Sequence, residues 1–114
     1  MRKTEIKFEI QLDEQHVPEK IYWDATDKKP QGYEETKAIC LSLWDEKHNS
    51  TLKIDLWAKD MPMLEMKRFY IETIGGLAQS LKNATGDDIM FTEIDDLCKR
   101  LGKYIEKESK EQNP

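Results

Sequence analysis

The sequence predicts an α+β fold, an antiparallel four-stranded meander sheet with two C-terminal helices packed on one of its faces. Up to residue 57, apolar and polar residues alternate in four segments, which is typical of half-buried strands. After residue 60, apolar residues recur every three or four positions, which is typical of amphipathic helices. At 114 residues the chain has room for one core. We therefore expect a single domain over residues 1–109 and a disordered C-terminal tail over 110–114.

The first two strands are predicted over residues 5–12 and 17–24. The apolar residues that share one face of these strands are Ile6, Phe8, Ile10, Leu12, Ile21 and Trp23. A four-residue turn between the strands sets Phe8 opposite Ile21, and a slip of one position would oppose apolar to charged side chains. Residues 25–35 are polar and are predicted as a loop.

Residues 37–45 admit two interpretations. The beginning of this segment has helical propensity, but from Ile39 onward the apolar period is two. A strand here can pair with a strand over residues 52–57 around the loop 46–51, which places Leu43 opposite Ile54. A helix would instead be apolar all round, without a clear stripe. We therefore favour a strand over a helix.

The first helix is predicted to begin at Asp60, with Asp60 as its cap and Pro62 in its first turn. Its apolar stripe consists of Met66, Tyr70, Ile74, Leu77 and Leu81. Gly75 and Gly76 interrupt this stripe. Because glycine is unfavourable inside a helix, the pair indicates either a bend or a close backbone contact.

The second helix is predicted after a break at Gly86, with Asp87 or Asp88 as its cap. The residues that it is expected to bury are Phe91, Ile94, Leu97, Cys98, Leu101 and Ile105. Residues 106–114 are charged and polar and are expected to fray.

The sequence contains no arrangement of residues that predicts catalysis, a metal site or a cofactor. His16 and His48 fall in predicted turns, and metal-ligand spacings and a phosphate-binding glycine loop are absent. The formal net charge is −5 and basic residues are scattered among acids, so we expect no nucleic-acid partner. No apolar run is long enough for membrane insertion, and no secretion signal stands near the start. We expect a cytoplasmic location.

Aromatic residues on the outer face of the sheet are the better indication of function. If the aliphatic residues point inward, Tyr22, Cys40, Trp44 and Trp57 point outward among polar side chains, which is typical of a protein-recognition surface. Alternatively, the two tryptophans fold over the sheet rim and complete the core. In a third interpretation this face pairs with its own copy in a homodimer.

Six segments carry a family resemblance: VPEKI at 17–21, WDA at 23–25, LSLWD at 41–45, TLKIDLW at 51–57, KDMP at 59–62 and EM at 65–66. In their order and spacing these segments resemble GldC, a gliding-motility protein family of Bacteroidetes. The resemblance runs from roughly Ile6 to Leu81. It implies a cytoplasmic accessory of the gliding machinery, which is associated with protein secretion across the outer membrane, and it brings no catalytic motif.

The residues and the resemblance together predict an accessory or adaptor that acts by protein–protein interaction and is not an enzyme. The expected partner is a protein of the gliding or secretion machinery, or a second copy of the chain. The alternative is a small ligand-binding domain or enzyme with a pocket between the sheet and the helices.

Overall fold

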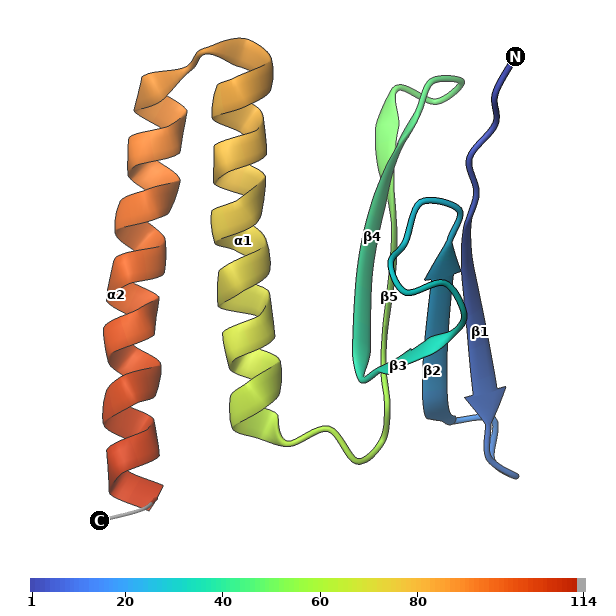
Figure 1. Cartoon of the computed structure of the whole chain (residues 1–114). Coiled ribbons are helices and arrows are strands. Elements are labelled where there is room, and N and C mark those ends of the chain that lie inside the picture. The colour runs from blue at the N-terminus through green and yellow to red at the C-terminus, as the bar shows by residue number, and fades with distance from the viewer. Residues whose placement is uncertain (113–114) are drawn as a thin grey trace. The chain divides into compact units, whose positions relative to one another are not determined.

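The structure is a computed structural model that describes residues 1–112 (Figure 1). Its elements in chain order are β1 (Ile6–Leu12), β2 (Pro18–Ala25), β3 (Glu34–Thr36), β4 (Ala38–Asp45), β5 (Ser50–Trp57), α1 (Met63–Thr85) and α2 (Asp88–Gln112). They form two compact units, Met1–Met61 with the strands and Pro62–Pro114 with the helices. The α+β class is confirmed. The expected packing of the helices on the sheet, and with it the single domain, stays a prediction.

The strands form two antiparallel sheets in place of the single four-stranded meander that the sequence predicts. The first has the order β1-β2-β3, and the second consists of β4 and β5. The two sheets meet at Lys37, where the chain bends between β3 and β4 and exchanges β2 for β5 as its partner. The Lys37 carbonyl accepts a hydrogen bond from the Ala58 N–H at 2.8 Å. The period of two runs through this bend, so the alternation of residue types does not reveal it.

The register of β1 on β2 differs from the predicted one by two residues. Phe8 lies opposite Trp23, and Ile10 lies opposite Ile21. From Ile6 to Gln11, a shift by two leaves each side chain on its predicted face, because the strand period is two. An irregularity follows Gln11: Gln11 lies opposite Lys20, but Leu12 lies opposite Pro18, so Glu19 is an extra residue on β2.

The hairpin of β4 and β5 confirms the strand interpretation of residues 37–45. Its turn is shorter than predicted, because Asp45 pairs with Ser50 and Asn49 takes a left-handed conformation at φ 49°. Leu43 consequently lies opposite Leu52 instead of Ile54. The faces are again as predicted, because the register changes by two.

Helix α1 begins later than predicted and runs without a break. Pro62 occupies the N-cap position with extended backbone, and Asp60 lies outside the helix, so Asp60 is not its cap. Gly75 and Gly76 both lie inside the helix. A Cβ on Gly75 would lie at an ordinary contact distance of 3.9 Å from Cys98 Sγ, and a Cβ on Gly76 would meet nothing within 4 Å, so neither glycine is required by a close contact.

The predicted end of α1 at Gly86 and the predicted cap of α2 at Asp87 are both confirmed. Gly86 ends α1 in the left-handed region at φ 72°, and Asp87 Oδ1 accepts the Met90 N–H at 2.9 Å. Helix α2 continues through Gln112, so residues 110–112 of the predicted disordered tail are helical, and residues 113–114 lie outside the described residues. The fraying expected from residue 106 is therefore not what the structure shows.

Helices α1 and α2 run side by side in their unit (Figure 1). Lys67 Nζ lies 2.7 Å from Glu108 Oε1, and Lys82 Nζ lies 4.7 Å from the centre of the Phe91 ring. Several apolar helix residues stay exposed: Met63, Leu77, Ile89, Met90, Leu97 and Tyr104. The expectation that Leu97 is buried is therefore wrong.

Candidate partner-binding surface

The β4–β5 hairpin brings together three of the four predicted surface residues. Ala38 pairs with Trp57, Cys40 with Asp55 and Trp44 with Thr51. Residues directly opposite one another share a face, so Cys40, Trp44 and Trp57 lie on one side of this sheet. The remaining side chains of that face are Ala38, Ser42, Thr51, Lys53 and Asp55. We call these eight residues the tryptophan face.

The two tryptophans stand at opposite ends of the tryptophan face. Trp44 is 66% exposed and lies beside the turn, while Trp57 is 47% exposed and lies at the end of β5. The stretch of β4 from Ala38 to Trp44 spans about 20 Å at the usual strand rise. The face is therefore a strip with an indole at each end and a thiol, hydroxyls and charges between them.

The fourth predicted residue, Tyr22, belongs to the other sheet. It lies in β2 opposite Glu9 of β1 and Glu35 of β3, and it is half-buried. The bend at Lys37 separates its sheet from the hairpin. Tyr22 thus does not belong to the tryptophan face.

The opposite face of the hairpin is aliphatic and also open. Its exposed members are Leu43, Leu52 and Ile54, each with about half of its surface accessible, and Ile39, Leu41 and Leu56 are half-buried. In this sheet, therefore, large apolar residues are accessible on both sides. Exposed apolar surface of this extent usually marks an interaction site.

A shallow hollow adjoins Trp57. Its lining residues are Val17, Pro18, Asp55, Leu56, Trp57 and Lys59. Two backbone bonds set its position: the Lys59 N–H donates to the Pro18 carbonyl at 3.0 Å, and the Ala58 N–H donates to the Lys37 carbonyl. Ala58 is fully buried. The segment after Trp57 is thus tied by backbone hydrogen bonds to the start of β2 and to the bend at Lys37.

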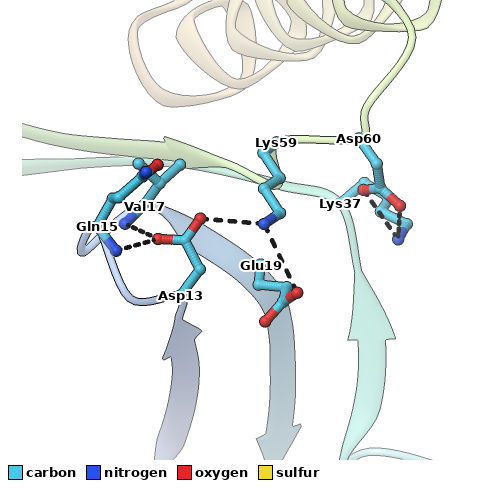
Figure 2. Close-up of polar contacts among 7 residues, drawn as sticks. All are labelled: Asp13, Gln15, Val17, Glu19, Lys37, Lys59 and Asp60. Atoms are coloured by element: carbon cyan, nitrogen blue, oxygen red, sulfur yellow. Dashed lines mark hydrogen bonds and ion pairs between the residues drawn. The ribbon is translucent and has the colours of Figure 1, made fainter.

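Asp13 and Lys59 form an ion pair that joins the segment after Trp57 to the turn before β2 (Figure 2). One carboxylate oxygen of Asp13 accepts the backbone N–H groups of Gln15 and Val17, at 2.8 and 3.0 Å. The other oxygen accepts from Lys59 Nζ at 3.0 Å. The Val17 N–H and then the Lys59 ammonium lower the pKa of Asp13, and Asp13 in turn raises the pKa of Lys59.

A second lysine joins the same region from the bend between the sheets. Lys37 Nζ lies 3.1 Å from Asp60 Oδ2 and 3.1 Å from Glu35 Oε1 (Figure 2 draws the contact with Asp60). The hydrogen bond with Asp60, followed by that with Glu35, raises the pKa of Lys37. Asp60, which the sequence predicts as a helix cap, thus holds the bend instead.

The turn of the hairpin is ordered by Asp45, next to Trp44. Asp45 Oδ1 accepts the Lys47 N–H at 3.1 Å, and Asp45 Oδ2 lies 2.7 Å from His48 Nδ1. His48 lies in this turn, as predicted. Its side chain is exposed, and its ring contacts the Asp45 carboxylate. Within residues 1–112, no group of three or more histidine, cysteine or acidic side chains could hold a metal ion.

Sequence reasoning missed Asp13 and Lys59, which position the Trp57 end. The sequence assigns Asp13 only to a polar turn, and 46 positions separate it from Lys59. An aspartate two residues before a turn N–H is a known turn signal. Nothing in the local pattern around Lys59 indicates which carboxylate it meets.

The model of the family described as "Gliding motility-associated protein GldC-like" matches residues 18–107. The chain belongs to the GldC-like family. The match begins at the first residue of β2 and ends in α2, so it includes the whole tryptophan face and excludes β1. It begins later and ends later than the resemblance seen in the sequence. No curated protein and no solved structure matches the GldC-like chain.

The family associates the chain with gliding motility. In the part of the chain that the structure describes, neither helix has the length and apolar character needed to cross a membrane. A pocket between the sheet and the helices stays a prediction.

Proposed function

We propose that this GldC-like chain is a non-enzymatic, cytoplasmic accessory of the gliding machinery that binds a protein partner through its tryptophan face. The single observation that carries the proposal is the pair of exposed indoles, Trp44 and Trp57, on one face of a hairpin. Tryptophan is strongly enriched among the residues that dominate the energy of protein interfaces. An exposed indole at each end of a strip gives a partner two anchors about 20 Å apart.

The surroundings of the indoles support a protein partner. The tryptophan face also carries Ser42, Thr51, Lys53 and Asp55, so a polar, charged strip separates the two anchors. Apolar anchors with polar neighbours are the usual composition of a non-obligate interface. The ordered turn at Asp45 and the anchored segment at Lys59 fix the two ends, which reduces the entropy lost on binding.

The alternative, in which the indoles complete the core, makes a different prediction about stability. Removing an indole from a core costs several kcal/mol, on the order of 3–5. Trp44, with two-thirds of its surface accessible, cannot lose that much packing. Its substitution by serine should therefore change binding without unfolding the chain.

The test compares Trp44→Ser, Trp57→Ser and their double variant with Tyr104→Ser, a variant of an exposed aromatic residue on α2. Tagged versions are expressed in a gliding bacterium, and the proteins of the gliding machinery that each version captures are quantified. We expect wild type and Tyr104→Ser to capture the same partner, and the double variant to lose it while its circular dichroism stays unchanged.

Capture that is equal for wild type and the folded double variant would exclude the tryptophan face as the binding site. Capture that is lost together with folding would place the indoles in the core.

A further inference from the structure

Strand β5 leaves one edge unpaired in the part of the chain that the structure describes. It pairs with β4 on one side, and the two strands alone make up their sheet. A two-stranded hairpin is marginally stable by itself, and three or more strands are normally needed. The exposed backbone groups of a free edge pair readily with another strand.

The sequence of β5 is complementary to itself in an antiparallel register centred on Ile54. In that register, Leu52 lies opposite Leu56 of the partner subunit, and Lys53 lies opposite Asp55 of the partner subunit. Each pair occurs twice by symmetry. The aliphatic residues stay on one face, and the opposite charges meet on the other. Both kinds of cross-strand pair are stabilising.

Neighbouring registers do not have this property. A shift by two residues places Lys53 opposite Lys53 of the partner subunit, and a shift by one opposes aliphatic to charged side chains. Within one chain Lys53 Nζ already lies 3.4 Å from Asp55 Oδ2, so both charges occupy the same face. The register centred on Ile54 is therefore selected by charge as well as by the face on which each side chain lies.

We propose that two copies of the chain pair antiparallel through β5, centred on Ile54, and form a four-stranded sheet of the order β4-β5-β5-β4. The pairing uses a strand edge, so it goes beyond the proposed function and leaves the tryptophan face open. It joins the two tryptophan faces into one surface with four indoles. A symmetric surface of this kind offers two equivalent sites to a partner.

Strand β1 also has a long free edge, at the side of its sheet away from β2, and it provides the matched control. Its residues Lys7 and Glu9 would oppose one another in a pairing centred on Phe8. Strand β1 already belongs to a three-stranded sheet, so it has less need of a further strand. Lys7→Glu therefore applies to β1 the charge reversal that Lys53→Glu applies to β5.

The test measures the mass of the purified full chain in solution across micromolar concentrations. We expect wild type and Lys7→Glu to dimerise equally. Lys53→Glu surrounds the symmetry axis with four carboxylates, and Asp55→Lys surrounds it with four ammonium groups. Because each variant turns both cross-strand pairs into like charges, it should raise the dissociation constant of its dimer by about tenfold or more.

Mixing the two weakened variants gives the decisive result. In the mixed dimer, the carboxylate introduced by Lys53→Glu would face the ammonium group introduced by Asp55→Lys. The native Asp55 of the first variant would face the native Lys53 of the second, so an equimolar mixture should recover the dimer. Circular dichroism of each variant alone confirms that it is folded, and if Asp55→Lys does not fold, the comparison of Lys53→Glu with wild type decides.

A monomeric wild-type chain would overturn the proposal, as would a dimer that Lys53→Glu leaves intact. A dimer broken by Lys7→Glu would place the contact on β1, and one broken only by Leu97→Lys would place it on α2. These outcomes are independent of the capture experiment, because the variants used there change Trp44 and Trp57 and leave the edge of β5 unchanged.

Discussion

Lys59 Nζ lies 3.0 Å from Asp13 Oδ2 and so joins the turn after β1 to the segment after β5. Lys59 also lies 3.6 Å from Glu19 at the start of β2. The contact thus connects both sheets at the end where Trp57 is exposed. The Lys59 side chain is 45% exposed and that of Asp13 only 16%, so solvent screens the ion pair from the lysine side.

Asp13→Asn should lower stability at neutral pH and flatten the loss of stability in acid. The pKa of Asp13 is lowered in the folded chain, so its stabilisation is present above the ordinary carboxyl pKa and is lost as pH falls through the lowered value. Asparagine keeps an acceptor for the backbone N–H groups but does not titrate. Urea unfolding of both proteins at a series of pH values measures the difference.

The matched control is Glu14→Gln, at an exposed neighbour in the same turn. It should leave the loss of the free energy of unfolding at acid pH unchanged. If Asp13→Asn keeps the full acid dependence of wild type, the carboxylate of Asp13 does not carry it.

Lys28→Ala should destabilise the loop between β2 and β3 far more than Lys29→Ala. The Lys28 side chain is only 5% exposed, and its Nζ donates to Glu34 Oε1 at 2.7 Å and to the Pro30 carbonyl at 2.5 Å. It also lies 5.3 Å from the centre of the Trp23 ring. Hydrogen bonds of a charged group contribute about 1.5–3 kcal/mol.

Lys29 is the adjacent exposed residue, and its substitution should change stability by less than about 0.5 kcal/mol. Denaturant unfolding of the two variants provides the comparison. Equal effects would mean that the buried ammonium does not order this loop.

Gly76→Ala should stabilise the helical unit by about 0.5–1 kcal/mol. The added Cβ meets no atom within 4 Å, and Gly76 lies inside a continuous helix, so only the entropy of the unfolded chain changes. Gly86→Ala is the opposite case, because its φ of 72° suits glycine and strains alanine. The midpoint temperature of thermal unfolding should rise for Gly76→Ala and fall for Gly86→Ala. A lower midpoint for Gly76→Ala would mean that the added Cβ meets a neighbouring atom.

The sequence predicted the faces of the strands better than their pairing. Both hairpin registers are displaced by two residues, and a displacement by two keeps Phe8 and Leu43 on their predicted sides. The turns decide the register, and they depend on left-handed residues such as His16 and Asn49, which no apolar pattern marks. The bend at Lys37 was hidden in the same way, since alternation continues through it.

The candidate surface was predictable only in part for a related reason. Alternation places Cys40, Trp44 and Trp57 on one face, as the structure has them, because they lie in one hairpin. Tyr22 shares their face only in one continuous sheet, and in the structure it belongs to the other sheet. The pair of Asp13 and Lys59 could not be predicted, because it depends on where two distant turns meet.

Photo-crosslinking from Ser42 tests the proposed function most directly. Ser42 is exposed on the tryptophan face between Cys40 and Trp44. A photo-reactive amino acid placed there in gliding cells should join the chain to a protein of the gliding machinery. The same amino acid at Gln79, exposed on α1, should not. An adduct with that protein from Gln79 and none from Ser42 would contradict the assignment of the tryptophan face as the binding surface.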